Sequence, residues 1–394
     1  MNGTGMRDLF LLDPGTIFLN HGSFGACPRQ VFERYQEWQV QLERQPVAFL
    51  DPERGYRRWM AETRRALAND LGTNADDLVG CVNATHGLNI VARSLPLEPG
   101  DEILMTDHEY AATQKTWDFV ARNTGAKLVY VAIPLPLTEA AQFNDAVIGA
   151  MTDRTRVLFA SHITSPTSLA FPLETVIEEA RHRGIYTVID GAHAPGHVSL
   201  DLDRLGADFY CGNCHKWMMA PKGAGFLHAR KEHQPMLDPL VISHGWQGDR
   251  MAEGPFGGSP FVDAMEIQGT RDPSAWLTVP EALRFRREQG LEEAAGTCSD
   301  LAHETAGRLL DLCRTEPLSS REYSAPLMVS VPVPTKKHAW LQRELHDRHR
   351  IEIPVVRWNA SSCLRLSVQC YNTRAEMDLL IEAVASLLKL PDGT

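Results

Sequence analysis

The sequence has no long uninterrupted run of apolar residues. No stretch approaches the roughly 20 apolar residues that a membrane-spanning helix needs. Residues 1–12 also lack the basic start and apolar run of a secretory signal. The 8 cysteines are irregularly spaced in 394 residues, which is typical of a reduced protein and not of a disulfide scaffold. We therefore expect a cytoplasmic protein without a membrane partner.

The chain also lacks a basic patch that could bind nucleic acid. Lys and Arg number 39 against 50 Asp and Glu, so the formal net charge is −11. The densest basic cluster, Arg57, Arg58, Arg64 and Arg65, alternates with Glu62 and apolar residues at helical spacing. This spacing favours a solvated helix face, and we expect no nucleic-acid partner.

Metal and haem sites have little support in the sequence. The run Cys211-Gly212-Asn213-Cys214-His215 has the C-x-x-C-H form of c-type haem attachment, but that chemistry belongs to exported proteins. A zinc site needs four protein ligands, or three and a water, and no second Cys/His pair stands at a suitable spacing. We expect neither haem nor a bound metal.

Strand-like and helix-like segments alternate through the first part of the chain. Apolar and β-branched runs predict strands at 78–82, 102–105, 127–133, 157–162, 185–189, 209–210 and 225–228. Helical spacing predicts helices at 57–69, 85–94, 117–122 and 173–180. This alternation indicates an α/β fold with a mainly parallel sheet and helices on both faces. Ligands bind such sheets beyond the carboxyl ends of the strands.

The pattern changes after a loop rich in Gly, Pro and Ser at residues 254–260. A long helical pattern runs from Ala275 to about Leu312, and strands near 327–333 and 363–368 and a helix at 374–388 follow it. We expect an N-terminal segment at 1–25, a large domain at 26–280 and a smaller C-terminal α+β domain at 281–394.

Two residues that follow predicted strands could carry cofactor chemistry. Asp190 ends the strand at 185–189, and Lys216 follows the strand at 209–210. A lysine that forms a Schiff base needs a site that keeps its amine reactive. Pyridoxal 5′-phosphate (PLP) needs an acidic partner for its pyridinium nitrogen. Spacing alone favours the ordinary alternative, a strand-end Asp and a surface Lys.

Motifs spread over nearly the whole chain carry a stronger signal. They are Asn20-His21-Gly22-Ser23-Phe24-Gly25, Asp107-His108-Glu109-Tyr110, SHITSPT at 161–167, Asp190-Gly191-Ala192-His193, Cys214-His215-Lys216-Trp217, APKGAGFL at 220–227 and Gly269-Thr270-Arg271-Asp272. Together they resemble the class V aminotransferase superfamily of PLP fold type I, and the first motif is similar to its isopenicillin N epimerase-like branch. The resemblance implies a PLP enzyme that acts at the α-carbon of an amino acid.

The resemblance also implies roles for individual residues. Lys216 would hold PLP and move the α-proton, Asp190 would pair with the pyridinium nitrogen, and His193 would face the ring hydroxyl or the substrate. Ser165 matches a contact of the ring oxygen, where many relatives carry Asn. Thr270 resembles a residue donated by a neighbouring subunit, which implies a homodimer.

The cofactor phosphate is expected where a helix opens after the strand at 78–82. Helix N-termini offer free N–H groups and a favourable dipole for phosphate, and here they would come from Thr85 and His86. By resemblance, Asn213 and His215 supply further contacts, with Asn213 in place of the more usual Ser. Tyr110 would cover the open face of the ring, and His108 is the competing candidate.

Arg365 is the candidate for binding the substrate carboxylate. Strict alternation places Arg365, Ser367 and Gln369 on one face of a strand, which we expect to be the wet face. By resemblance its guanidinium would bind the α-carboxylate. Arg357 is a second, weaker basic candidate, and Asn20 and His21 would line the substrate end of the site.

The reaction type remains open among routes that share their first step. With Lys216 as the base at the α-carbon, return of the proton on the opposite face gives an epimerase, which is our leading hypothesis, with Tyr110 as the candidate acid. Loss of a β-substituent gives a C–S lyase, and transfer of the amine gives an aminotransferase. A binding or scaffold protein without turnover is the non-enzyme alternative. A desulfurase is disfavoured because no cysteine lies in a recognisable Gly-rich catalytic loop.

Overall fold

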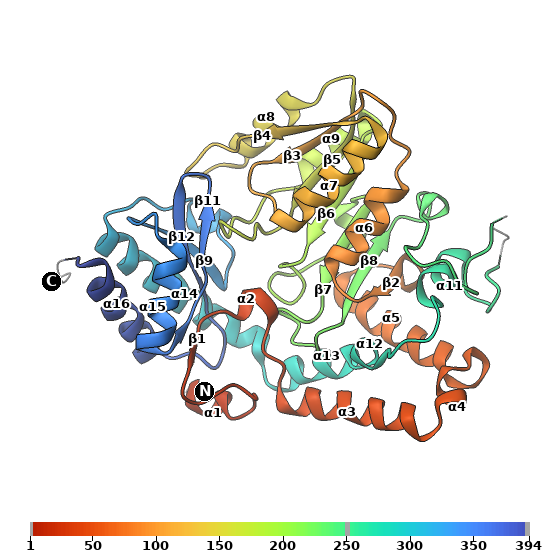
Figure 1. Cartoon of the computed structure of the whole chain (residues 1–394), viewed down its shortest axis with the longest axis horizontal. Helices are drawn as coiled ribbons and strands as arrows, with labels where there is room; N and C mark the ends of the chain where they lie inside the picture. The colour runs from red at the N-terminus through yellow and green to blue at the C-terminus, as the bar shows by residue number, and fades with distance from the viewer. Residues whose placement is uncertain (1–2, 249–252, 391–394) are drawn as a thin grey trace.

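The computed structural model describes residues 3–248 and 253–390. The first two residues of the predicted N-terminal segment and the last four of the predicted C-terminal domain lie outside the described residues. Within the described ranges, no helix has the length and apolar character needed to cross a bilayer. The chain builds a large sheet and a smaller sheet, each covered by helices (Figure 1).

The large sheet has seven strands in the order β2-β8-β7-β6-β5-β3-β4. Strands β3 to β7 pair in parallel, and β8 runs antiparallel to both of its neighbours, β2 and β7. The strands are β2 Leu78–Cys81, β3 Glu102–Thr106, β4 Lys127–Val131, β5 Thr155–Ser161, β6 Tyr186–Gly191, β7 Phe209–Asn213 and β8 Gly225–Ala229. The predicted mainly parallel α/β sheet is confirmed.

Alternation along each strand builds a separate apolar core on each face of this sheet. In β5, Val157 and Phe159 pack toward α6 and α7, whereas Leu158 and Ala160 pack toward α8 and α9. The helices over the large sheet are α5 Arg57–Leu71, α6 Ala84–Ser94, α7 Ala111–Thr124, α8 Ala140–Ala150, α9 Glu174–His182, α10 Leu202–Leu205 and α11 Pro260–Glu266. Burial on both faces explains why these strands are continuous apolar runs in the sequence.

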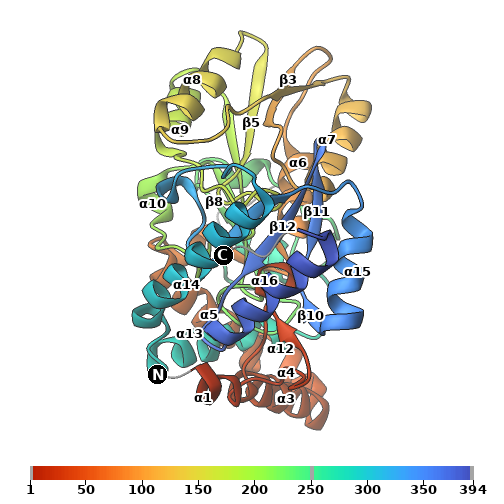
Figure 2. The same ribbon diagram turned by 90° about the vertical axis from the view of Figure 1, so that its left-hand side faces the viewer.

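The smaller sheet is antiparallel, in the order β11-β12-β9, and its helices pack on the side away from the large sheet (Figure 2). Its elements are α14 Leu291–Cys313, β9 Met328–Val333, α15 His338–His349, β11 Val355–Trp358, β12 Ser361–Ser367 and α16 Arg374–Leu388. The α+β character predicted for this part is present. The exact domain boundaries stay a prediction.

The N-terminal segment is tied to the C-terminal part of the chain. Strand β1 (Ile17–Phe18) pairs in parallel with β10 (Ile351–Glu352). The chain then passes through α2 (His21–Phe24), which lies between the two sheets, to α3 (Arg29–Arg44) and α4 (Pro46–Leu50) along the base (Figure 1). A short helix, α1 (Gly3–Arg7), precedes β1.

The long helical pattern predicted for 275–312 is three helices, not one. They are α12 (Ser274–Leu277), α13 (Val279–Glu288) and α14. Pro280 sits in the first turn of α13 and lacks the N–H that a continuous helix would use there. Gly290 has φ of +60°, a left-handed conformation that ends the helical path before α14.

The prediction of a fully solvated arginine face on α5 is wrong for one residue. Arg57, Arg58 and Arg65 are exposed, but Arg64 is buried and forms an ion pair with the buried Glu266 of α11. A buried guanidinium requires such a carboxylate, because an unpaired buried charge is costly. Helical spacing could not reveal that α11 covers this part of α5.

Candidate active site

A cavity of about 360 Å³ opens at the carboxyl ends of the central parallel strands. Ser161 ends β5, Asn213 ends β7, and Asp190 lies one residue before the end of β6. Ser161 pairs with Asp190 in the sheet register. The cavity is lined by Ser23, Phe24, Val82, Asn83, Ala84, Thr85, Tyr110, Ser161, Ile163, Ser165, Asp190, Ala192, His193, Asn213, His215, Lys216, Lys222 and Gly223.

Most of the residues predicted for the site meet on the wall of this one cavity. These are Thr85, Tyr110, Ser165, Asp190, His193, Asn213, His215 and Lys216. Five predicted residues lie outside the lining: Asn20, His21, His86, Thr270 and Arg365. The shared edge of the sheet explains this convergence, since parallel strands end on the same side.

Lys216 has a perturbed amine. Its Nζ lies 3.0 Å from Nε2 of His193. Burial, reinforced by the positive charge of Arg365, lowers the pKa of Lys216 to about 7. A substantial fraction of the amine is therefore neutral near neutral pH, which is the reactive form of a lysine nucleophile or base.

His193 is an enclosed, neutral imidazole. Burial, followed by the charge of Lys216, holds the pKa of His193 well below its usual value. When Lys216 carries its proton it donates to Nε2, so the imidazole hydrogen is on Nδ1. That Nδ1 is buried and has no hydrogen-bond partner within the described part of the chain. The site therefore presents a buried donor without an acceptor.

Asp190 is a buried carboxylate near the amine. Its side chain accepts a 2.9 Å hydrogen bond from the backbone N–H of Ala192. Burial raises the pKa of Asp190, and the hydrogen bond from Ala192 and the charge of Lys216 oppose this rise. A carboxylate and an amine thus face one enclosed space from the ends of neighbouring strands.

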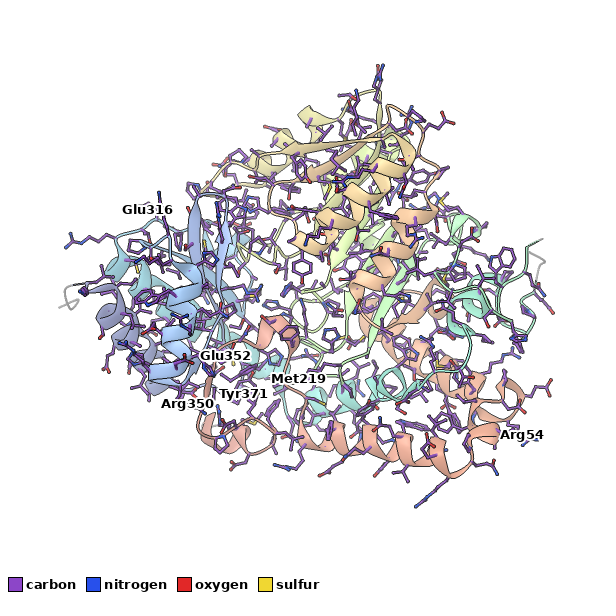
Figure 3. All side chains as sticks on the ribbon, viewed as in Figure 1. Arg54, Met219, Glu316, Arg350, Glu352 and Tyr371 are labelled. Atoms are coloured by element: carbon purple, nitrogen blue, oxygen red, sulfur yellow. The ribbon has the colours of Figure 1, made fainter. Side chains whose placement is uncertain are left out.

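The loop that carries Lys216 is held in place by the N-terminal motif. The Nε2 of His21 lies 3.1 Å from the carbonyl oxygen of Lys216, and its Nδ1 lies 2.8 Å from the hydroxyl of Tyr371, which is labelled in Figure 3. Because the carbonyl can only accept, Nε2 carries the hydrogen and Nδ1 accepts from Tyr371. Gly25 has φ of +69°, and a Cβ there would lie 2.1 Å from the carbonyl oxygen of His215.

These contacts differ from the substrate role predicted for His21 and Asn20. The His21 ring is fully buried, and burial lowers the pKa of His21 to about 3. Asn20 donates a 2.9 Å hydrogen bond to Glu352, also labelled in Figure 3. Both side chains join the N-terminal segment to its surroundings instead of facing the cavity.

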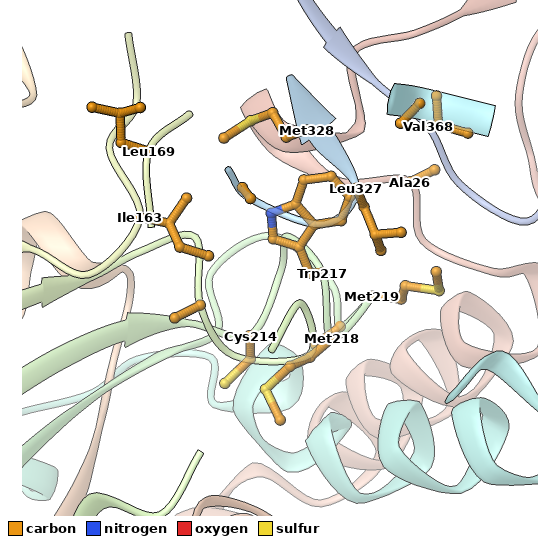
Figure 4. Close-up of a cluster of buried hydrophobic side chains, with 14 of the residues drawn as sticks. Ala26, Ile163, Leu169, Cys214, Trp217, Met218, Met219, Leu327, Met328 and Val368 are labelled. Atoms are coloured by element: carbon orange, nitrogen blue, oxygen red, sulfur yellow. The ribbon is translucent and has the colours of Figure 1, made fainter. Parts of the chain in front are cut away.

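Apolar packing fixes the other side of the lysine loop. Trp217, Met218 and Met219 are fully buried. Figure 4 shows them in a cluster with Leu327 and Met328, which come from the region of the small sheet. The Lys216 loop is therefore anchored by both parts of the molecule.

The first turn of α6 approaches the end of β7 closely. The Asn213 side chain accepts a 2.8 Å hydrogen bond from the N–H of Ala84, and Asn83 accepts one of 2.9 Å from the N–H of His86. A Cβ on Gly87 would lie 2.9 Å from Sγ of Cys211, so glycine permits this approach. The helix start, with its positive dipole end, borders the cavity at Thr85.

Of the two aromatic candidates for the open face, Tyr110 lines the cavity. It precedes α7 and is 46% exposed. His108 is fully buried, bonds to Thr167 at 2.7 Å and stacks on Trp358 with ring centroids 4.5 Å apart. His108 is thus part of the packing between the large sheet and β11.

Arg365 lies behind the cavity wall, contrary to the expected wet strand face. It is 5% exposed, and Ser367 and Gln369 on the same face are also buried. Its Nη1 donates to the carbonyl oxygen of Ser165 at 2.8 Å and to Oγ of Ser165 at 2.9 Å. Its Nη2 donates to Oγ of Ser23 at 2.7 Å. The face is covered because β12 packs toward the large part of the molecule.

Glu109 was not predicted for the site, although it belongs to a recognised motif. Its buried carboxylate accepts 2.6 Å hydrogen bonds from the hydroxyls of Thr106 and Ser161 and a 3.1 Å bond from the Ser161 N–H. Burial raises the pKa of Glu109 to about 7, and the negative charge of Asp190 adds to the rise. An acidic residue just after a buried strand was the available signal.

Thr270 is exposed and is not among the residues that line this cavity. Four residues that line the cavity were not predicted as site residues: Ser23, Phe24, Val82 and Lys222.

Among the described residues, no group of three or more His, Cys, Asp and Glu side chains could hold a metal ion.

Comparisons with known proteins found a family match and similar relatives along most of the chain. The family model for aminotransferase class V matches residues 25–380. Isopenicillin N epimerase of Streptomyces clavuligerus is 37% identical over 388 residues, which cover 97% of this chain and 97% of that protein. A probable chloroplastic L-cysteine desulfhydrase of Arabidopsis thaliana is 28% identical over 411 residues, covering 96% of this chain and 84% of that protein.

A solved structure shares the fold. It is a mutant of C-DES with glycine covalently linked to its PLP cofactor, and it matches with a TM-score of 0.80 and 20% sequence identity. The match covers 96% of this chain and 98% of that chain. The arrangement of a large mainly parallel sheet with a small antiparallel one is therefore common to both.

Proposed function

This chain belongs to the aminotransferase class V family, as its motifs predicted, and we propose that it is a PLP-dependent epimerase acting at the α-carbon of an amino acid. The observation that carries the proposal is the meeting of the Lys216 amine and the Asp190 carboxylate on one cavity wall. The full-length similarity to an isopenicillin N epimerase supports the choice of reaction.

The cavity fits PLP in four respects. Lys216 offers an amine for a Schiff base, and Asp190 offers a buried acid for the pyridinium nitrogen. The start of α6 at Thr85, with Asn213 and His215 beside it, suits a phosphate. His193 lines the cavity with its Nε2 3.0 Å from the lysine amine, where the imidazole would face the ring hydroxyl. We propose further that Ser165 and Tyr110 contact the ring.

The residues of the chain would then remove a proton from one face of the α-carbon and deliver a second proton to the opposite face. When bound, PLP supplies an electron-withdrawing ring that stabilises the negative charge left at the α-carbon. Lys216, with its pKa of about 7, accepts the α-proton on one face. The hydroxyl of Tyr110 donates a proton on the other face, so the configuration is inverted. His193 holds the lysine amine between these events through its 3.0 Å contact.

Product analysis in deuterated water tests this proposal. The PLP-loaded protein is incubated with a panel of L- and D-amino acids and thioether conjugates, and products are resolved on a chiral column. We expect both enantiomers of a substrate to take up α-deuterium and to converge on one mixture. Lys216→Ala should abolish the exchange, and borohydride should fix PLP to Lys216 in the native protein. A fully active Lys216→Ala variant would reject the mechanism.

Tyr110→Phe tests the second face. We expect this variant to keep α-deuterium exchange from one enantiomer and to lose inversion at least tenfold. Tyr130→Phe is a matched control, because Tyr130 is 48% exposed and lies outside the cavity. Undiminished inversion in Tyr110→Phe would remove Tyr110 from the proton path.

A β-eliminating C–S lyase is the second candidate. The similarity to an L-cysteine desulfhydrase favours it, and the same cavity and base would serve it. Pyruvate and ammonia in the product analysis would identify this reaction, and a new amino acid formed from an added keto acid would identify an aminotransferase. Desulfurase chemistry has less support, because no cysteine among the described residues lines the cavity.

We also propose a homodimer in the cytoplasm. Thr270 is exposed and does not line the cavity of its own chain, which suits a residue that enters the site of a second copy. Within the described residues all 8 cysteines are unpaired, as in a reducing compartment. Sedimentation equilibrium would give the mass in solution, and Thr270→Ala should weaken PLP binding if the site is shared.

A further inference from the structure

We propose that His197 is a positioning residue that links the start of the small sheet to the two residues that meet at the reactive amine, Lys216 and His193. This inference rests on the proposed function, because it concerns the lysine that would hold PLP. His197 is not among the residues that line the active-site cavity. It therefore acts through its neighbours and not by contact with a substrate.

Three contacts fix the imidazole of His197. Its Nδ1 lies 3.0 Å from the carbonyl oxygen of His193, and its Nε2 accepts a 2.8 Å hydrogen bond from the N–H of Leu327. Its face stacks on Trp217, with ring centroids 4.0 Å apart and an interplanar angle of 27°. One ring thus contacts the backbone of His193, the neighbour of Lys216 and the residue that precedes β9.

The hydrogen bonds of this ring define its tautomer. The backbone N–H of Leu327 can only donate, so Nε2 of His197 carries no hydrogen and Nδ1 donates to the carbonyl oxygen of His193. Burial lowers the pKa of His197 to about 3, so the ring stays neutral. Both ring nitrogens are bonded to backbone groups, which suits a role in geometry and not in proton transfer.

The two segments that His197 holds meet at the lysine amine. The Nζ of Lys216 lies 3.0 Å from Nε2 of His193. Trp217 follows Lys216 directly and is fully buried, and His193 lies in the segment that follows β6. A hydrogen bond weakens steeply when its distance or angle changes, so a shift of either segment would disturb this contact. Because one ring binds both segments, we expect it to fix their separation.

The turn before His197 lies directly against the lysine loop. Gly196 has φ of +74°, and a Cβ there would lie 2.7 Å from the backbone N of Met218. A side chain at this position would therefore push the turn away from the loop. Glycine at this position lets the ring of His197 reach Trp217.

Two conservative variants separate the two hydrogen bonds of the ring. The amide of asparagine reaches the place of Nδ1, so His197→Asn keeps a donor for the carbonyl of His193 and loses the acceptor for Leu327. The amide of glutamine reaches the place of Nε2, so His197→Gln keeps that acceptor and loses the donor. His197→Phe keeps a ring against Trp217 and loses both hydrogen bonds.

The test measures the reactivity of the Lys216 amine without a substrate or turnover. PLP at a series of concentrations is mixed with the full-length, PLP-free chain, and borohydride added at set times fixes the PLP that has reached Lys216. The limiting rate at saturating PLP reports the geometry of the amine, and the PLP concentration at half this rate reports binding. We expect His197→Gln and His197→Phe to lower the limiting rate about tenfold or more, and His197→Asn to keep it within about threefold.

A purely structural role of His197 predicts another pattern. Loss of folded protein would reduce the number of sites at which PLP is fixed, and not the limiting rate per site. His197→Asn leaves the N–H of Leu327 without an acceptor, so it should unfold a few degrees below the native chain and still keep the native rate. Equal limiting rates in the Asn and Gln variants, whether native or reduced, would overturn the proposal.

His228→Gln is the matched control. His228 is also buried, but it pairs with Tyr210 near the start of β7, whereas the cavity lies at the carboxyl ends of the strands. This variant should retain the native limiting rate, and a rate lowered as much as in His197→Gln would also overturn the proposal.

Failure of the proposed function gives a different result. If borohydride fixes no PLP to Lys216 in the native chain, both the proposed function and this inference are wrong. If PLP is fixed there and His197→Gln keeps the native limiting rate, only this inference is wrong.

Discussion

At the scale of the residue, reactivity at the site comes from burying a lysine whose hydrogen-bond partner is an imidazole and not a carboxylate. Lys216 contacts the neutral His193, and the charge of Arg365 opposes its protonation. The same burial should appear as a dependence of stability on pH, because an amine with a lowered pKa binds its proton more weakly when folded.

Lys216→Met should stabilise the PLP-free chain near neutral pH. Above pH 10.5 the amine is neutral in both the folded and the unfolded chain, and below about 7 it is protonated in both. Between these values only the unfolded chain takes up the proton, so the free energy of unfolding of the native chain rises with pH. Each pKa unit corresponds to about 1.4 kcal/mol, so the variant should gain several kcal/mol near pH 7 and progressively less toward higher pH.

Urea unfolding at a series of pH values measures this gain. Lys115→Met replaces an exposed lysine on α7 and should show no such pH dependence. A gain in Lys216→Met that is absent at pH 7, or that grows between pH 7 and 10, would show that the amine is solvated in the folded chain.

At the scale of the element, the junction of β7 with α6 shapes the expected phosphate end of the cavity. Asn213 serves as the acceptor for the first N–H of α6, and Gly87 lets the helix lie against Cys211. A helix start normally leaves its first N–H groups unpaired. Here one of them is used to fix the helix to the sheet, and Thr85 is left facing the cavity.

Asn213→Ala should leave the N–H of Ala84 buried without an acceptor. We expect a loss of about 1–2 kcal/mol in the free energy of unfolding of the PLP-free chain, measured by urea denaturation. Asn213→Asp retains an acceptor, so its stability should stay close to that of the native chain. Its added negative charge should nevertheless weaken PLP binding at least tenfold. Equal stability of all three chains would show that this hydrogen bond does not fix α6.

At the scale of the whole molecule, the N-terminal segment joins the two sheets. Its β1 pairs with β10, its Phe10 packs on Tyr371 with ring centroids 4.9 Å apart, and its His21 supports the Lys216 loop. Residues from the first and last parts of the chain therefore share one core with the site. Loss of this packing should affect the whole protein and not only its terminus.

Phe10→Ala should therefore destabilise the chain by about 3 kcal/mol, the usual cost of deleting a buried aromatic ring. Leu11→Ala is the matched control, since Leu11 is 48% exposed and should change stability by less than about 0.5 kcal/mol. Urea denaturation followed by tryptophan fluorescence would report both values. Similar stabilities of the two variants would show that the segment is not part of the cooperative fold.

Regular periodicity made much of the fold predictable. Strands buried on both faces, such as β5 and β6, are continuous apolar runs, and amphipathic helices such as α5, α6 and α16 show a clear stripe. Short elements that take their stability from neighbours, such as β1 and α2, gave no such signal. The periodicity of apolar residues indicates which side chains are buried, but an element of two to four residues is too short to show a period.

The sequence by itself determined the order of the elements, the mainly parallel sheet and the motifs that bring Lys216, Asp190 and His193 to one cavity. Each of these follows from local periodicity or from residues a few positions apart. Only the tertiary structure decided that Arg365 donates hydrogen bonds to Ser23 and Ser165, and that His21 bonds to the carbonyl oxygen of Lys216. The physical reason is that burial and hydrogen-bond partners depend on which distant element packs against a side chain. The spacing of residues along the chain does not predict that packing.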